Sequence, residues 1–429
     1  MSAEDAFAGG AALARCLIVG GTGFIGRHIA GRLAAASHSV MAAGRGDIDI
    51  ARDFPARLRA KVAGFDVVVN CAGLVRDEGA NTMDAVHAEG AMRLFSACIG
   101  AGLARFIHIS ALGATAQGET DYQRSKGTAE AFFLDADPHG ERIDWRVLRP
   151  SVVVGRGGAS TRWLLAAAAL PVLPRIGRDD WKFQPVHVDD LAELVTRLAE
   201  GAESARMIDV VGPEPMTAYE LERILRNWLR LRPTGSVRIP DRLFEIATEI
   251  GGRFTSGPLN PDVMKMLAGG NVSDPAALTA ALGRPPKSIR TALAEEPASD
   301  ADRLAARLLF LKPVLRWSLA ILWIVTGLLS FGLYSVDKSY DLLAAIGLTG
   351  PVASLALYGG AALDFILGLI LLRGWRPALI GWIQLASMAA FTLLAMGLPG
   401  EYWLHPFAPI LKNLPIAAAI LVMIAMEAD

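Results

Sequence analysis

The sequence is poor in cysteine, with three residues in 429, at positions 16, 71 and 98. Their spacing matches no arrangement typical of metal ligands, so we expect no metal centre. An odd number of thiols is also unlike a disulfide framework and is typical of reduced side chains in a cytoplasmic domain. Cys16, Cys71 and Cys98 are therefore expected to serve as packing residues.

Net charge is nearly absent. The chain has 42 Lys and Arg residues against 43 Asp and Glu residues, a formal charge of -1, which favours no nucleic-acid partner. Residues 1–12 are rich in Ala and Gly and lack the basic start and apolar core of a signal peptide. We expect a flexible N-terminus there, followed by a domain that stays in the cytoplasm.

Charged residues are scarce in the last quarter of the chain. Of the 85 Lys, Arg, Asp and Glu residues, only 10 lie in residues 317–429, while 52% of the whole sequence is hydrophobic. Four apolar stretches are each long enough to cross about 30 Å of hydrocarbon: 317–334, 351–372, 377–398 and 407–426. The last stretch crosses only if Lys412 reaches the interface. The sequence predicts a polar linker over 295–312 and an all-α four-helix transmembrane bundle over 313–429.

Basic residues predict the orientation of this bundle. Arg316 precedes the first span, and Arg373 and Arg376 lie between the second and third. By the positive-inside rule these sides face the cytoplasm. We therefore expect a multi-pass protein of the cytoplasmic (inner) membrane, in contact with the lipid bilayer, with the N-terminal domain and the C-terminus in the cytoplasm.

Asp364 is the one acid inside a predicted span. An ionised carboxylate facing lipid is costly, so Asp364 should face protein or water. Gly359, Gly360 and Gly368 would let another helix approach, and Gln384 could donate a hydrogen bond. We hypothesise that Asp364 has a functional or assembly role; a buried hydrogen bond without chemistry is the alternative.

Glycine clusters at the start of the chain, where a short apolar run is followed by helical periodicity. The residues of this turn are Gly20, Gly21, Thr22, Gly23, Phe24, Ile25 and Gly26. Both G-x-x-G-x-x-G and G-x-G-x-x-G fit, a pattern that lets the backbone approach a pyrophosphate at a helix N-terminus. The alternative is a strand-helix corner without a ligand.

Further strand-like runs indicate a parallel sheet covered on both faces by helices. The run 40–45 ends at Arg45, whose guanidinium suits the 2'-phosphate of NADP, so NADP(H) is favoured over NAD(H) unless Arg45 is a plain surface residue. The run 65–73 ends in small residues, and 106–110 ends at Ser110. The fold class is an α/β Rossmann fold with a doubly wound parallel sheet.

Tyr122 and Lys126 are four residues apart in a predicted helix and so share one helix face. A cation beside a phenol lowers the pKa of that phenol, which would let Tyr122 exchange a proton near neutral pH. Lys126 could also hold the nicotinamide ribose.

Together these motifs resemble the short-chain dehydrogenase/reductase superfamily, in its extended or atypical branch, over residues 13 to about 290. The matching pieces are the glycine turn, 70–73, Ser110, Tyr122 with Lys126, 148–155 and 186–190. Two further stretches, 257–263 and 270–273, resemble the 39 kDa accessory subunit of respiratory complex I and its bacterial relatives. His87 departs from the pattern, because relatives often have Asn there.

The resemblance implies roles for individual residues. Tyr122 corresponds to the general acid/base, Lys126 to the ribose-binding partner and Ser110 to the hydroxyl that orients the substrate carbonyl. It also implies that Asn70, Ala72 and Gly73 contact the cofactor. An NAD(P)-binding domain is expected over 13–294, with a substrate-side region from about 151.

The layout of the spans resembles the DoxX-like family of small four-helix bacterial membrane proteins. The sequence therefore predicts a membrane-tethered NADP(H)-dependent oxidoreductase that transfers hydride to or from a carbonyl or quinone-type substrate. The alternative is an NADPH-binding scaffold or assembly factor for a respiratory-type membrane complex.

Overall fold

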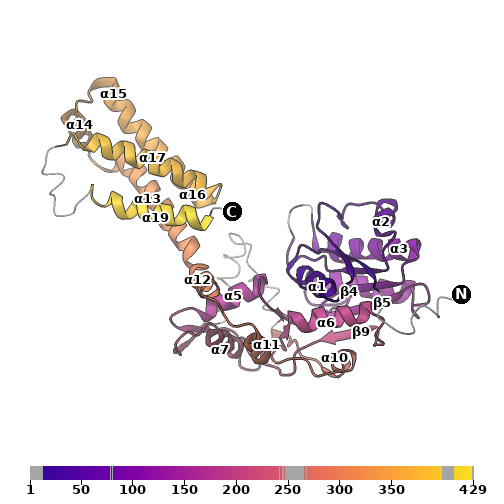
Figure 1. Cartoon of the computed structure of the whole chain (residues 1–429). Coiled ribbons are helices and arrows are strands. Elements are labelled where there is room, and N and C mark those ends of the chain that lie inside the picture. Colours follow the sequence, from indigo (N-terminus) through magenta and orange to yellow (C-terminus); the bar gives the residue numbers. More distant parts are fainter. Residues whose placement is uncertain are drawn as a thin grey trace. The chain divides into compact units, whose positions relative to one another are not determined.

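The computed structural model describes residues 13–77, 79, 81–240, 242–243, 246, 265–266, 268–398 and 410–427. The chain divides into two units between Ala306 and Arg307, inside the expected linker. Every strand among the described residues belongs to the first unit, and the second unit is helical (Figure 1). The predictions for 1–12 and 257–263 lie outside the described residues.

A six-stranded parallel sheet forms the centre of the first unit. Its order is β2 (Ser39–Ala43), β1 (Arg15–Val19), β3 (Val67–Asn70), β4 (Arg105–Ile109), β5 (Asp144–Pro150) and β9 (Met207–Val210). Because all pairs are parallel, the carboxyl ends of the strands lie along one edge, where open α/β sheets bind their ligands. The predicted Rossmann-like fold is confirmed.

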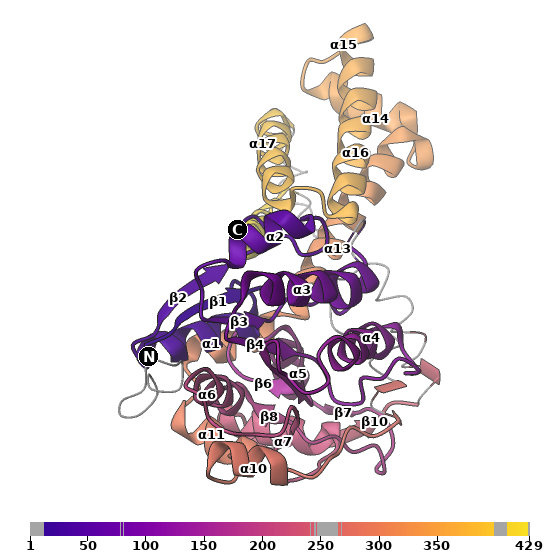
Figure 2. The ribbon, with the colours of Figure 1, turned by 90° about the vertical axis from the view of Figure 1, so that its right-hand side faces the viewer.

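Helices cover both faces of this sheet, and alternation along β1 shows why. Cys16 and Ile18 join one buried cluster, while Leu17 and Val19 join the other. The first face is covered by α1 (Phe24–Ala35), α6 (Val188–Ala199) and α10 (Ala276–Leu282). The second face is covered by α2 (Pro55–Val62), α3 (Ala91–Ala101) and α4 (Asp121–Ala136). Figure 2 shows α1 and α6 on the opposite side of the strands from α2 and α3.

The chain after residue 151 contributes both to a smaller group of strands and helices and to the main sheet. Small parallel pairs form between β6 (Val153–Val154) and β8 (Val186–His187), and between β7 (Leu173–Arg175) and β10 (Ser236–Arg238). They lie with α5 (Ala159–Ala168), α7 (Ala218–Trp228) and α11 (Ile289–Glu295). However, β9 and α6 return to the main sheet and its covering helices. The substrate-side region expected from about 151 is therefore not one continuous stretch.

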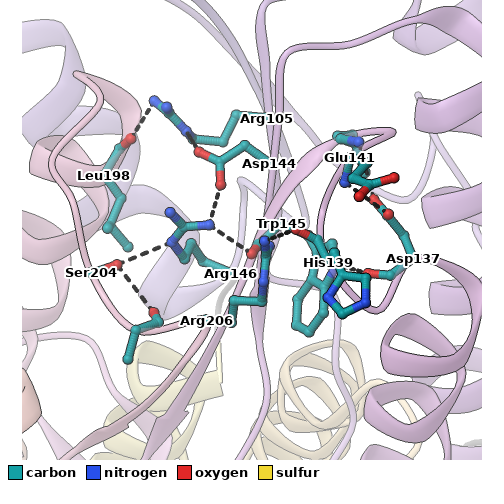
Figure 3. Close-up of polar contacts among 12 residues, drawn as sticks. Arg105, Asp137, His139, Glu141, Asp144, Trp145, Arg146, Leu198, Ser204 and Arg206 are labelled. Carbon is teal, nitrogen blue, oxygen red and sulfur yellow. Dashed lines mark hydrogen bonds and ion pairs between the residues drawn. The ribbon is translucent and has the colours of Figure 1, made fainter.

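The amino ends of β4 and β5 are fastened by a polar network away from the ligand edge (Figure 3). Arg105 Nε lies 2.7 Å from an Asp144 carboxylate oxygen, and Arg146 Nε donates to Ser204 Oγ at 3.1 Å. Trp145 Nε1 donates to the Asp137 carbonyl at 2.8 Å. The charged residues near the start of β5 therefore have a structural role, which is to hold the strand ends together.

The membrane unit follows α12 (Asp300–Leu308). Its main helical stretches are α13 with η2 (Leu311–Leu328, Leu329–Leu333), α15 with η3 and α16 (Gly350–Ser354, Leu355–Gly359, Gly360–Arg373), α17 (Pro377–Ala395) and α19 (Asn413–Glu427). A further helix, α14 (Val336–Ala345), was not predicted. Among the described residues, three helical stretches are long and apolar enough to cross a membrane: Leu311–Leu333, Gly350–Arg373 and Pro377–Ala395.

The fourth predicted span, 407–426, lies only in part within the described residues and stays a prediction. The described helix α19 has 15 residues, about 22 Å at 1.5 Å per residue, which is shorter than the expected stretch 407–426. Its end is nevertheless fixed, because Glu427 lies 3.1 Å from Lys312 and 3.5 Å from Arg316. The end of α19 therefore lies at the same end of the bundle as the start of α13.

Candidate nucleotide and catalytic site

The glycine turn between β1 and α1 is packed tightly on one side and open on the other. Gly20 has φ +76°, and a Cβ there would lie 2.8 Å from the Ala72 nitrogen. A Cβ on Gly21 would meet Ala42 at 2.7 Å, and one on Gly26 would collide with the Gly20 carbonyl. Gly23 is exposed, and a Cβ there would meet only the Gly20 carbonyl oxygen, at 3.2 Å. The turn thus presents its backbone to solvent at Gly23.

No side chain caps the N-terminus of α1. Gly23 occupies the N-cap position with no side-chain cap, and the first turn holds no acid. Amide N–H groups of the first turn can then bind an anion, aided by the helix dipole. This arrangement fits the pyrophosphate of a dinucleotide. Thr22 is exposed, whereas Phe24 and Ile25 are half-buried, with the Phe24 ring edge against His28 at 5.3 Å.

Arg45 lies just beyond the carboxyl end of β2 and is exposed. The turn before it is held by Asp47, whose Oδ2 accepts the Gly44 N–H at 2.9 Å. A Cβ on Gly44 would lie 3.1 Å from the Thr22 methyl group. The turn that carries Arg45 therefore adjoins the glycine turn.

The loop after β3 lies against the glycine turn through the Gly20–Ala72 approach described above. Asn70 is fully buried, with Oδ1 accepting the Ala72 N–H at 3.1 Å and Nδ2 3.1 Å from His108 Nδ1. The Asn70 side chain thus shapes the loop, and its expected contact with the cofactor stays a prediction. Ala72 is half-buried and Gly73 is exposed.

Helix α4 carries Tyr122 and Lys126, and its start is set by a capping box between Thr120 and Gln123. Lys126 is buried and its Nζ donates to the Ile109 carbonyl at 2.8 Å. A Cβ on Gly73 would lie 3.7 Å from this Nζ. Burial lowers the pKa of Lys126 to about 8, while the Cys71 and Glu130 charges oppose that shift.

Tyr122 does not have the lowered pKa that its spacing from Lys126 predicted. Burial raises the pKa of the Tyr122 phenol, and the Lys126 ammonium is directed to the Ile109 carbonyl instead. The sequence argument was wrong because a shared helix face does not fix where a long side chain ends.

Ser110 has a hydrogen-bond partner within the protein. Its buried hydroxyl donates to the Glu130 carboxylate, which in turn accepts Arg149 Nε at 3.0 and 3.1 Å. A hydroxyl has one proton to donate. In this arrangement the Ser110 proton is directed to Glu130, and the role of orienting a substrate carbonyl, which the resemblance implies, stays a prediction.

His87 is a site residue that the sequence reasoning treated only as a departure from the pattern. Its Nε2 accepts the Leu74 N–H at 2.7 Å, and its Nδ1 lies 3.0 Å from Ser125 Oγ. The ring packs edge-on against Tyr122, with centroids 5.3 Å apart. Burial, with smaller effects from Lys126 and His108, lowers the pKa of His87 to about 2. The structure thus gathers Gly73, His87, Tyr122 and Lys126.

Asp364 and Gln384 are the buried polar residues among those that the structure describes in the membrane unit. Asp364 is 9% exposed, and Gln384 is 0% exposed. Neither amide atom of Gln384 has a hydrogen-bond partner among the described residues. Close helix approach occurs at Gly368, where a Cβ would lie 2.8 Å from the Ile324 nitrogen, whereas Gly359 contacts only Leu355 of its own helix.

Comparison with known proteins adds a family to each unit. Residues 16–211 match the model of the NAD dependent epimerase/dehydratase family, and residues 320–421 match that of the DoxX-like family. No group of three or more candidate metal ligands occurs in the part of the chain that the structure describes.

Two curated relatives and one solved structure illustrate the similarity. NADH dehydrogenase [ubiquinone] 1 alpha subcomplex subunit 9, mitochondrial, of Arabidopsis thaliana is 27% identical over 238 residues, which are 50% of this chain and 58% of that protein. Ceramide reductase of Caulobacter vibrioides is 30% identical over 189 residues, 41% of this chain and 57% of the relative. Epimerase Mth375 of Methanothermobacter thermautotrophicus has a TM-score of 0.50 at 16% identity, over 66% of this chain and 90% of that chain, and so supports the fold.

The matched region spans less than two thirds of the length of either curated relative. Taken together, the two family matches show an epimerase-type, short-chain dehydrogenase/reductase-like NAD(P)-binding domain, followed by a DoxX-like membrane domain. A lipid bilayer is therefore a partner of the second unit.

Proposed function

We propose that this chain is a membrane-tethered NADP(H)-dependent oxidoreductase acting on a carbonyl or quinone-type substrate. The observation that carries the proposal is the adjacency of two features. The uncapped start of α1 offers anion-binding amides, and the Gly20–Ala72 approach joins its turn to the loop where Gly73 meets Lys126. A bound nicotinamide would supply or accept the hydride.

Lys126 would bind the cofactor, and Tyr122 would donate the proton. Lys126, anchored on the Ile109 carbonyl, would bind the ribose as a cation at neutral pH. The raised pKa of Tyr122 favours the neutral phenol, which is the form that can donate a proton. As hydride reaches the carbonyl carbon, the C=O electron pair would move to oxygen and take the proton from Tyr122. Solvent would later reprotonate the phenolate.

Arg45 supports the preference for NADP(H). It is exposed at the end of β2, in a turn that adjoins the glycine turn through Gly44 and Thr22. A guanidinium can bind the 2'-phosphate of NADP, whereas NAD offers a hydroxyl that an acid would bind.

The charges of the membrane unit support a location in the cytoplasmic membrane with both chain ends in the cytoplasm. Lys312, Arg316 and Glu427 meet at one end of the bundle, and a Cβ on Gly374 would lie 3.3 Å from the Arg316 guanidinium. Arg373 and Arg376 flank that glycine. Basic residues thus gather where α13 begins and α16 ends, as expected of the cytoplasmic side, and the end of α19 lies beside them through Glu427.

The test begins with full-length protein purified in detergent. Bound nucleotide is identified, and its oxidation by carbonyl compounds and quinones is measured. For a substrate that is turned over, Tyr122→Phe should keep nucleotide affinity but lower kcat by about 10² to 10⁴, the usual contribution of a positioned proton donor. Full turnover by Tyr122→Phe would show that Tyr122 is not the acid.

A scaffold that holds NADPH within a respiratory-type complex is the second candidate. The similarity to a mitochondrial NADH dehydrogenase subunit favours it. In that case NADPH should copurify and stabilise the protein, while no carbonyl or quinone oxidises it and Tyr122→Phe changes nothing measurable.

A further inference from the structure

His87 joins two elements that are far apart in the sequence. Through Nε2 it holds the backbone of Leu74, in the loop 71–75 after β3. Through Nδ1 it reaches Ser125 on α4, and Ser125 Oγ in turn contacts the Tyr122 carbonyl at 3.2 Å. His87 itself lies in the π-helical turn η1 (Asp84–Gly90), which leads into α3.

The hydrogen-bond partners fix the tautomer of His87. Because the Leu74 N–H is a donor, Nε2 must be the unprotonated nitrogen. Nδ1 therefore carries the hydrogen and donates it to Ser125 Oγ, and the Ser125 hydroxyl donates to the Tyr122 carbonyl. Each donor in this chain has one acceptor.

This arrangement removes His87 from proton transfer. Protonation would turn Nε2 into a donor that faces the Leu74 N–H, and burial already disfavours the charged ring. A fully buried, neutral imidazole with both nitrogens engaged can orient its neighbours but cannot exchange protons with a substrate.

We propose that His87 is a positioning residue that couples the order of the cofactor-facing loop 71–75 to the placement of Tyr122 and Lys126. The ring supports the Tyr122 side chain from one side. Its Nε2 lies 3.4 Å from the place of a Cβ on Gly73, beside the Lys126 ammonium. The inference rests on the proposed cofactor site, but the order of the loop can be measured without any substrate.

The thiol of Cys71 is a built-in reporter of this loop. Cys71 is half-buried, whereas Cys16 and Cys98 are fully buried. Burial raises the pKa of the Cys71 thiol to about 12. While the loop is ordered, this thiol should therefore react slowly with a maleimide, and opening of the loop should raise the labelling rate. Cys71→Ser identifies the labelled position.

The key variant is His87→Leu in the full-length protein, which keeps the volume but leaves the Leu74 N–H without its acceptor. We expect labelling of Cys71 to rise and NADPH affinity, measured by its fluorescence, to fall, each by roughly ten- to a hundredfold. His87→Gln, which retains an acceptor for Leu74, should restore part of both values.

The matched control is His38→Leu. His38 is also buried and accepts a backbone N–H, from Ala14 at 3.2 Å, but it lies at the other end of β1. The His38→Leu variant should leave Cys71 labelling and NADPH affinity within about twofold of wild type. The two variants are compared at temperatures at which they are equally stable. Equal effects of both variants, or wild-type labelling in His87→Leu, would overturn the coupling. If labelling changes as expected while no substrate is ever turned over, the coupling stands and the proposed hydride transfer falls.

Discussion

Three polar side chains buried near the candidate site are hydrogen-bonded, whereas one buried polar side chain of the membrane unit has no partner among the described residues. In the nucleotide-binding unit, Asn70, His87 and Glu130 are buried, and each has hydrogen-bond partners from other elements. In the membrane unit, Gln384 is the one residue among those described with two buried side-chain polar atoms that lack a partner. The paired groups fix the shape of the site, so their loss should damage geometry as well as stability.

The contrast has a physical reason. An unpaired polar group is costly in any dry interior, and more so in hydrocarbon, where water cannot compensate. The hypothesis that Asp364 on α16 has a functional or assembly role stays a prediction, with a purely structural role as the alternative, and Gln384 on α17 is a buried residue without a described partner. Their pairing state is the property that the experiments below would change.

The largest effect should follow from breaking the paired network at Glu130. Glu130→Leu removes the acceptor of both the buried Ser110 hydroxyl and the half-buried Arg149 guanidinium, and each group left without its partner costs about 1 to 3 kcal/mol. Thermal unfolding of the first unit should shift down accordingly, whereas Glu130→Gln, which keeps hydrogen-bonding atoms, should lose less. Equal stability of the Leu variant and wild type would remove the network from the account of the site.

Arg45 should have the next largest effect, because it is exposed at the carboxyl end of β2, where the 2'-phosphate of NADP is expected. Losing one charge-assisted contact costs about 1.5 to 3 kcal/mol, or roughly ten- to a hundredfold in NADPH affinity. Arg45→Ala should leave NADH affinity unchanged. A wild-type protein that binds both nucleotides equally, and an Ala variant that does the same, would contradict this role.

A smaller effect should appear with pH through Lys126. Its pKa in the folded protein, about 8, lies below the usual 10.5, so the cation is lost as pH rises through 8. NADPH affinity should weaken between pH 7 and 9, by at most about tenfold if one charged contact is lost. Neither His87 nor Cys71, with pKa values near 2 and 12, titrates in that window.

The sign for stability is the reverse. Between pH 8 and 10.5 the unfolded chain binds the Lys126 proton more strongly, so this residue adds stability as pH rises through that window. Lys126→Met should abolish both dependences. A binding curve for Lys126→Met that still bends near pH 8 would assign the titration elsewhere.

The smallest change in stability should come from Gln384, because it has no described partner to lose. Gln384→Leu should be neutral or stabilise the detergent-solubilised bundle by about 1 kcal/mol. Destabilisation by more than that amount would mean that Gln384 has a partner outside the described residues.

Two substitutions of Asp364 distinguish a functional role from a structural one. Asp364→Asn keeps shape and hydrogen bonding but removes ionisation, whereas Asp364→Leu removes both. Activity lost in the Asn variant, with an intact bundle, would indicate a role that needs the charge. Failure to fold only in the Leu variant would indicate structure, and wild-type behaviour of both would leave Asp364 with neither role.

Local patterns in the sequence were sufficient for the architecture. The strand-turn-helix at 16–26, the parallel Rossmann fold and the apolar helices of the second unit follow from periodicity and glycine spacing. These features depend on residues close together in the chain, so a single sequence contains them. The roles of Tyr122 and Lys126 as a catalytic pair remain predictions of the same kind.

Tertiary structure decided which atoms meet. Ser110 donates a hydrogen bond to Glu130, 20 residues away, and His87 contacts Ser125, 38 residues away. The end of α19 meets the start of α13 through Arg316 and Glu427, 111 residues apart. Such pairings depend on how helices pack on the sheet and on each other, and no spacing within one helix or strand encodes them. The sequence by itself therefore determined the fold class and the candidate residues. Only the packing of the elements determined which groups share each hydrogen bond and which charges pair.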